Sequence, residues 1–164
     1  MPKTLKRRRH EGKTDYGKRL KLLKSHAPRI IFRKTNKYIL VQYVESREAQ
    51  DKVVIGLSSK NLIKHGWPEN AQGSLKSLPA SYLVGFLMGR KIIKEKLKTP
   101  IIDFGMHRMI HKSRTYAFLN GLIDAGIKLK HKAETFPEKE RIEGKHMKNK
   151  IPFEKIKLNI EKEK

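Results

Sequence analysis

The sequence predicts an α/β fold with a mixed sheet, in which an antiparallel meander gains one parallel crossover strand and packs with helices. Three observations support this fold class. Strand-like segments precede the first long helical segment, another strand-like segment follows that helix directly, and both chain ends are dominated by charge. The 164 residues suffice for one core. We expect a basic N-terminal arm at residues 1–28, an α/β domain at 29–128, and a basic helical C-terminal extension with a tail at 129–164.

The net charge of the chain points to a polyanionic partner. Lysine and arginine number 39 against 16 acidic residues, which gives a formal charge of +23 and a pI near 10.3. Residues 1–37 alone hold 14 basic and 2 acidic residues and too little apolar surface to form a core. Nucleic acid is the first candidate, because phosphates neutralised by lysine and arginine release condensed counterions. A membrane surface is the second, but the arm lacks the apolar stripe that it requires.

Composition also excludes several classes of protein. The chain has no cysteine, so it has neither a disulfide framework nor a thiolate metal site. The longest apolar run, residues 82–88, is far shorter than the roughly 20 residues that cross a bilayer. No glycine-rich phosphate loop and no serine nucleophile motif is present. We therefore expect an intracellular protein without a cofactor.

The first helix and three strands follow from local signals. Asp15 is a suitable cap for a short helix that must end before Pro28, because the residue before a proline avoids helical geometry. The loop at 34–37 joins two strand-like segments into a hairpin with a basic tip. Short links between consecutive strands favour an antiparallel meander. The three strands are predicted at residues 30–33, 38–44 and 53–58.

Residues 59–105 hold the predicted core helix and the crossover strand. Residues 59–77 are weakly patterned, with room for one short helix. Ser77 then caps a helix that has Pro79 in its first turn and continues to Leu97. Its two glycines, four residues apart at 85 and 89, are expected to let it lie close to the sheet. Residues 101–105 are short and apolar, which is typical of a central strand.

The last third of the chain begins with a basic loop at residues 106–112. Ser113 is predicted to cap a helix that runs to about residue 125, where Gly126 stops it. A peripheral helix is expected near residues 137–148. Because charge alternates there with isolated apolar residues, we expect a solvated or RNA-bound tail beyond it.

The consecutive Arg7, Arg8 and Arg9 are the clearest binding signal, since guanidinium groups contact phosphates and base edges. A nuclear-import or solubilising run is the alternative. Aromatic rings beside basic clusters can hold unstacked RNA bases, although each ring is as well explained by packing on the core edge. The rings concerned are Tyr16, Tyr38 and Tyr116.

Catalytic or metal chemistry has weaker support. His107 and His111 have the spacing of a zinc pair on a helix, but Gly105 indicates a loop, so histidines facing RNA or solvent are favoured. Asp103 lies in an apolar strand and resembles the acid of a two-metal nuclease, yet no acidic partner is spaced to join it. The other acids considered, which we interpret as surface or packing groups, are Glu45, Asp51 and Asp124.

Residues 7–16, which read Arg-Arg-Arg-His-Glu-Gly-Lys-Thr-Asp-Tyr, resemble the opening of a ribosomal family. The family is the universal 5S-rRNA-binding proteins of the large subunit, protein eighteen in bacterial and archaeal naming and protein five in eukaryotes. The resemblance covers roughly residues 6–148, and its last part is similar to the C-terminal extension of archaeal members. Its other segments are residues 28–37, 80–85, 103–108, 113–114, 121–126, 136–138 and 141–146.

The resemblance implies a non-enzymatic protein of the cytoplasmic ribosome that binds 5S rRNA and helps attach it to large-subunit rRNA in the central protuberance. It also implies contact with large-subunit ribosomal protein five, the other universal 5S-binding protein. No membrane partner and no homo-oligomer are expected. The residues implied to contact RNA from the arm, the hairpin tip and the loop are Arg7, Arg8, Arg9, Lys13, Thr14, Tyr16, Arg19, Arg33, Asn36, Lys37, His107, Arg108, Ser113 and Arg114.

Two positions depart from the family pattern. His10 stands where a fourth arginine is common, and Lys112 stands where a glycine is expected before Ser113. Two other classes of function stay open at this point. A metal-dependent nuclease would need clustered carboxylates, and a DNA-compacting protein would bind duplex DNA without preferring a folded RNA.

Overall fold

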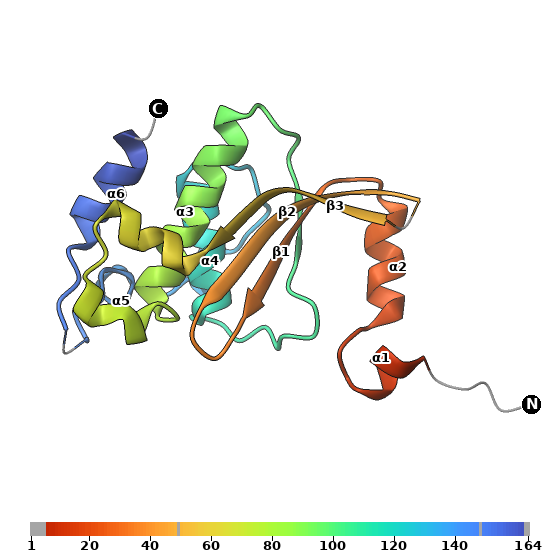
Figure 1. Ribbon diagram of the computed structural model, residues 1–164, viewed down its shortest axis with the longest axis horizontal. Coiled ribbons are helices and arrows are strands. Elements are labelled where there is room, and N and C mark those ends of the chain that lie inside the picture. The colour runs from red at the N-terminus through yellow and green to blue at the C-terminus, as the bar shows by residue number, and fades with distance from the viewer. Residues whose placement is uncertain (1–5, 49, 148, 163–164) are drawn as a thin grey trace, which may run out of the picture.

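A four-stranded mixed sheet lies at the centre of the computed structural model, which describes residues 6–48, 50–147 and 149–162. β1 and β3 each run antiparallel to β2, and β4 runs parallel to β1 (Figure 1). The predicted meander with a parallel crossover strand is confirmed, but the crossover strand lies at the edge of the sheet beside β1, so its predicted central position was wrong. In spatial order, the strands are β3 (Gln50–Ser58), β2 (Ile39–Arg47), β1 (Arg29–Lys34) and β4 (Ile101–Asp103).

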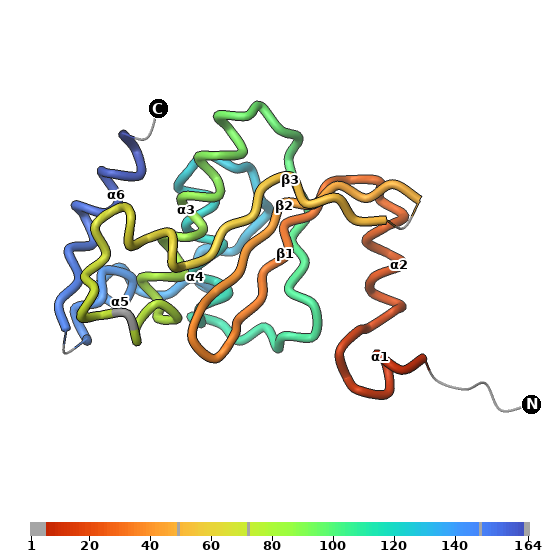
Figure 2. Tube along the Cα trace, viewed as in Figure 1, coloured from red at the N-terminus to blue at the C-terminus, as the bar shows by residue number. Residues whose placement is uncertain are grey.

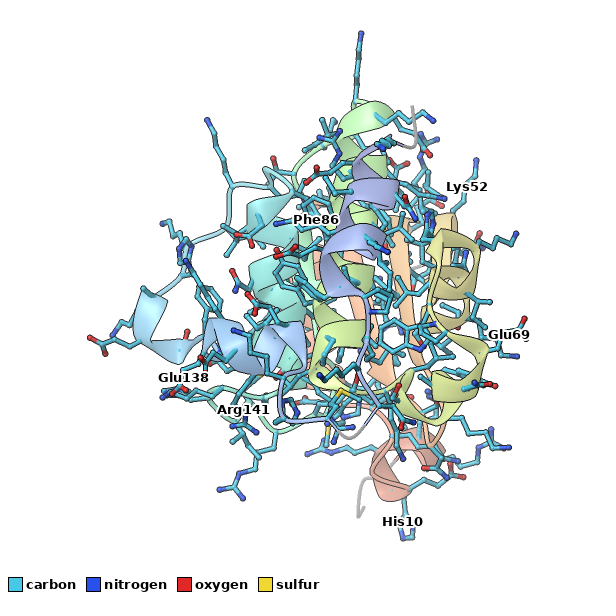
Figure 3. The ribbon with its side chains drawn as sticks, turned by 90° about the vertical axis from the view of Figure 1, so that its left-hand side faces the viewer. His10, Lys52, Glu69, Phe86, Glu138 and Arg141 are labelled. Atoms are coloured by element: carbon cyan, nitrogen blue, oxygen red, sulfur yellow. The ribbon has the colours of Figure 1, made fainter. Side chains whose placement is uncertain are left out.

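Among the described residues, α3 (Leu78–Lys94) and α4 (Arg114–Asp124) cover one face of this sheet (Figure 3). Along β2, Ile39, Val41 and Tyr43 are fully buried, whereas Leu40 and Gln42 are exposed. Because successive strand side chains point to opposite faces, the exposed set belongs to an open face. Figure 3 shows helices in front of the packed face, with α3 next to α4.

The two glycines of α3 bring it close to α4 rather than to the sheet, so our expectation for them was wrong. A Cβ at Gly85 would overlap the carbonyl oxygen of Phe118, and one at Gly89 would lie 2.5 Å from the Cβ of Ala125. Gly121 is their counterpart on α4, because its Cβ would overlap the carbonyl oxygen of Tyr82. Glycines on both helices therefore permit a backbone approach that no other residue allows.

The weakly patterned segment after β3 forms two 3₁₀ helices, η1 (Ser59–His65) and η2 (Glu69–Ser74). Trp67 between them is 2% exposed and donates its indole N–H to the carbonyl of Ala71 at 3.1 Å. Leu62 and Leu75 are also buried. This segment extends the core beyond the sheet edge, which its sequence pattern did not indicate.

The C-terminal part is more closely attached than predicted. After η3 (Ala133–Thr135) and α5 (Lys139–Glu143), the chain forms α6 (Phe153–Lys162). Ile156 and Ile160 of α6 are 0% and 1% exposed. Residues 153–162 are therefore not a detached tail, because two isoleucines one turn apart suffice to fix a short helix on α3 and η1.

Candidate nucleic-acid interface

The basic arm contains two helices, α1 (Arg7–His10) and α2 (Tyr16–Lys24), neither of which has a buried residue. Asp15 caps α2 as predicted, since its carboxylate accepts the backbone N–H of Lys18 at 3.1 Å. Between the helices the chain folds back, and Arg8 Nε donates to Thr14 Oγ1 at 3.0 Å. Lys6 lies over the Tyr16 ring at 4.6 Å. These contacts fix the turn between α1 and α2, and the cations of both helices face solvent.

Side-chain contacts of α2 attach the arm to the body. Lys18 Nζ donates to the carbonyl oxygen of Gly105 at 3.2 Å, just after β4. Arg19 Nη2 lies 3.2 Å from Asp51 Oδ2 on β3. Both contacts join charged or polar groups at the surface, so they orient α2 without burying it. In Figure 1 α2 stands beside the end of the β2–β3 hairpin, and α1 lies below it.

A buried arginine continues this network beneath the arm. Arg29 is 2% exposed and its Nη2 donates to Asp51 Oδ1 at 2.7 Å, while its Nη1 lies 3.9 Å from Asp103 Oδ2. Ser46 Oγ also donates to Asp51 at 2.7 Å. Burial alone would raise the pKa of Asp51, but the hydrogen bond from Ser46 and the charges of Arg29 and Arg19 outweigh it and lower that pKa.

Asp51→Asn should remove part of the acid sensitivity of the fold. Because the pKa of Asp51 is lowered, its ionised form stabilises the fold above the unfolded-state pKa near 3.8, and this contribution is lost as pH falls through the folded-state pKa. The difference in melting temperature between wild type and variant should thus be largest near neutral pH and shrink below about pH 4. Thermal melts of wild type and variant at several acid pH values measure this difference, with the exposed Glu69→Gln as control. A difference in melting temperature that stays constant with pH would contradict the prediction.

Arg33, which the resemblance assigned to RNA, is held by the body. Its Nη1 donates to the carbonyls of Phe32 and Asp103, both at 2.9 Å, and its Nη2 lies 3.2 Å from Asp103 Oδ2. The side chain is 40% exposed. It therefore presents one side to solvent while positioning β4 against β1.

Five of the fourteen implied RNA-contacting residues meet at one crevice of about 110 Å³ between the arm and the body. Buried Arg29 and Asp103 form part of its floor. The arm and the body contact each other beside this crevice, through Lys18 and Arg19. The five residues are Arg8, Lys13, Thr14, Arg19 and Arg33.

The hairpin tip and the loop after β4 form a second basic group. Asn36 and Lys37 are exposed at the tip. The backbone N–H of Lys34 donates to His107 Nε2 at 3.4 Å, which ties the loop to the tip. Burial, followed by the charges of Lys34 and Arg33, lowers the pKa of His107, so the ring stays neutral and able to accept. Exposed Arg108 follows in the same loop.

The start of α4 lies in a separate hollow of about 490 Å³. Arg114 Nη1 donates to the carbonyl of Lys76 at 3.1 Å. Ser113 occupies the cap position, but its hydroxyl bonds to that of Thr115 rather than to the helix backbone. Ser113 and Arg114 are therefore not gathered with the arm residues. Arg7, Arg9 and Tyr16 do not line the arm crevice either.

Lys112 has a φ of +55°, in the left-handed region that favours glycine. Glycine is the residue that the family resemblance led us to expect there. Lys112→Gly should therefore be more stable than Lys112→Ala by about 1 kcal/mol, because only glycine relieves the backbone strain. Both variants lose the exposed pair with Glu138 at 3.3 Å. Thermal melts of the two variants test this, and equal melting temperatures would contradict it.

The other two predicted aromatic platforms already have partners. Lys60 Nζ lies 4.5 Å from the centre of the Tyr38 ring, and His111 meets Tyr116 edge to face at 5.5 Å. His111 and His107 thus have different neighbours.

Within residues 6–48, 50–147 and 149–162, no group of three or more histidine, aspartate or glutamate side chains could hold a metal ion. Asp103, the acid considered for a nuclease, is bonded to arginines instead.

Sequence reasoning missed several residues of this surface. Lys18 and Asp51 attach the arm, and only the fold brings them to their partners. The loop after β4 also exposes three large apolar side chains beside its basic residues. Their pattern was visible in the sequence, but nothing there showed that they face solvent; they are Met106, Met109 and Ile110, with exposures of 57%, 40% and 56%.

α1, the hairpin tip and the loop after β4 lie toward the lower edge of the molecule in Figure 1. Figure 2 follows the chain from the end of α3 through β4 to the lower edge, where the loop at 106–112 passes near the hairpin tip. Within the described part of the chain, no helix is both long and apolar enough to span a membrane.

Comparison with known proteins shows the family of the chain. The model of a family described as ribosomal large subunit proteins 60S L5 and 50S L18 matches residues 3–100. Large ribosomal subunit protein uL18 of Korarchaeum cryptofilum is 45% identical over 141 residues, which span 86% of this chain and 70% of that protein. The uL18 protein of Methanococcus maripaludis is 39% identical over 143 residues, or 87% and 72% of the two chains. The chain therefore belongs to the non-enzymatic family of large-subunit ribosomal proteins that includes archaeal uL18.

Proposed function

We propose that the chain binds 5S rRNA with its arm side and helps attach it to large-subunit rRNA in the central protuberance. As a member of its family, the chain is a component of the large ribosomal subunit and associates with rRNA. The proposal concerns which RNA it holds and with which surface. It also includes contact with large-subunit ribosomal protein five, which rests on the family resemblance.

One observation supports the proposal most directly: the exposed cations of the arm are held in a fixed direction by the body. α1 and α2 bury no residue, yet Lys18 and Arg19 fasten α2 to Gly105 and Asp51. A segment that only added charge for solubility would not need these contacts. A folded RNA presents phosphates at defined positions, so a cationic arm held at a defined angle favours it over an arbitrary polyanion.

The implied RNA-contacting residues take different roles in this proposal. Cations of the arm and tip neutralise phosphates, and Tyr16 offers a ring for stacking once Lys6 moves to a phosphate. Asn36 can hydrogen-bond to a base edge or a sugar. Arg33 contacts RNA only through the side that Asp103 leaves free. The phosphate-binding group consists of Arg7, Arg8, Arg9, Lys13, Arg19, Lys37, Arg108 and Arg114, with Thr14, His107 and Ser113 as hydrogen-bonding neighbours.

A salt titration against matched RNAs tests the proposal. The full chain is titrated with 5S rRNA and with a tRNA at salt concentrations from low to physiological. We expect both RNAs to bind at low salt, and 5S rRNA alone to keep an advantage of at least about a hundredfold at physiological salt. Two curves that fall together with one slope would contradict the proposal. Equal binding to duplex DNA of similar length would favour DNA compaction instead.

A further inference from the structure

A second basic groove lies far from the arm, between η1, α3 and α6. It has a volume of about 470 Å³, and the described residues that line it include three lysines, a histidine and two asparagines but no carboxylate. α6 is the helix that the sequence left as a tail, and its packing creates one wall of the groove. These polar lining residues are Asn61, Lys64, His65, Lys91, Asn159 and Lys162.

The groove is a built feature rather than a chance gathering of surface lysines. Asn159 Nδ2 donates to the carbonyl oxygen of His65 at 2.9 Å, which links α6 to η1 across it. Ile156 and Ile160 fix α6 from beneath, because both are almost fully buried. The three lysines that line the groove thus come from three separate elements, η1, α3 and α6.

The positive charge extends beyond the groove. An adjoining hollow of about 290 Å³ shares Leu87 and Lys91 with it and adds Arg90 and Lys94, against one acid, Glu95. Glu161 of α6 does not line the groove. It lies one turn after Lys157, whose Nζ is 5.2 Å from the Phe86 ring. On that side of α6, burial and the hydrogen bond to Asp124 raise the pKa of Tyr82, and the charge of Glu161 adds a smaller effect.

We propose that this groove is the site that holds the phosphate backbone of large-subunit rRNA, at the end of the molecule opposite to the arm. The inference rests on the proposed function, which assigns the arm to 5S rRNA. Lysine ammonium groups and asparagine amides are suited to phosphate and sugar contacts, whereas an acidic protein segment would be expected to meet more apolar surface than the single Leu87. Figure 1 shows α6 and α1 at opposite ends of the long axis. Figure 3, viewed from the α6 end, shows α6 in front of α3 with η1 beside it.

The test compares two triple variants of the full chain with equal loss of charge. The groove variant is Lys64→Gln, Lys91→Gln and Lys162→Gln. The control variant replaces three exposed lysines outside both surfaces, namely Lys128→Gln, Lys130→Gln and Lys139→Gln. Tethered 5S rRNA is saturated with each protein and then offered a labelled transcript of archaeal large-subunit rRNA at physiological salt.

Wild type and control should capture the transcript, whereas the groove variant should capture it about tenfold less well while binding 5S rRNA within about twofold of wild type. The slope of log affinity against log salt for the transcript should become shallower by roughly 2 to 3 in the groove variant. Equal capture by the groove and control variants would overturn the inference, as would failure of the wild-type complex to capture the transcript.

The inference and the proposed function can fail separately. If wild type does not prefer 5S rRNA to tRNA, the proposed function fails, and the transcript is then bound directly to each tethered protein. A loss confined to the groove variant would still support the groove as an RNA site. No difference from the control would overturn it.

Discussion

Deleting residues 1–24 should lower the affinity for 5S rRNA by roughly a hundredfold to a thousandfold and leave the body folded. The segment holds ten lysines and arginines against two acids. If about six of these cations contact phosphates, the slope of log affinity against log salt becomes shallower by roughly four to five. The body should survive because α1 and α2 bury no residue and add nothing to the core.

Binding curves at several salt concentrations measure the loss, and circular dichroism with a thermal melt reports on the body. The triple lysine variant at residues 128, 130 and 139 shows how much of the loss follows from total charge alone. A truncated protein that binds 5S rRNA as tightly as the full chain would contradict the role of the arm. A truncated protein that does not fold would instead show that the contacts of Lys18 and Arg19 stabilise the body.

Gly121→Ala should destabilise the fold by about 3 kcal/mol, at the upper end of the range for overpacked cores. The added Cβ would overlap the carbonyl oxygen of Tyr82 and lie 2.9 Å from the backbone nitrogen of Phe86. Backbone atoms of a buried helix cannot turn away as a side chain does, so α3 and α4 must separate. For a chain of this length the melting temperature should fall by about 10 °C, despite the higher helix propensity of alanine.

Asn120→Ala is the matched control, since it changes the neighbouring residue of α4 without requiring a closer helix approach. We expect its melting temperature to stay within a few degrees of wild type. If Gly121→Ala cannot be purified, Gly89→Ala gives a milder form of the same overlap, because it meets the side chain of Ala125. Adding Ala125→Gly should then recover part of the loss. A Gly121→Ala protein that melts like wild type would contradict close helix packing.

Much of the fold was predictable because its signals are local. Asp15 and Ser77 cap their helices as expected, and Gly126 ends α4 with a φ of +109°. The β-branched and aromatic residues at 38–44 predicted the strand that forms most of β2. The order of strand, helix and strand predicted a parallel crossover strand, but not its place at the sheet edge beside β1. The caps and the strand signals depend on residues within a few positions of one another.

The candidate site was predictable in composition but not in arrangement. Charge marked the arm, and the motif at residues 7–16 marked its family. Arg33 and Arg108 had equal standing in the sequence, yet Arg33 is bonded to Asp103, seventy positions along the chain. No local sequence pattern distinguishes an arginine that is free to bind a phosphate from one that forms an ion pair with a carboxylate of its own chain.

By itself the sequence determined the fold class, the helix caps, the basic arm and the family, because propensity, capping and charge act through neighbouring residues. Only the tertiary structure decided which helix the glycines of α3 face, how α6 packs and where Asp51 holds the arm. These features depend on contacts between residues far apart in the chain, whose free energy appears only once the backbone brings the partners together. The second basic groove is of this kind, since its lysines come from three separate elements.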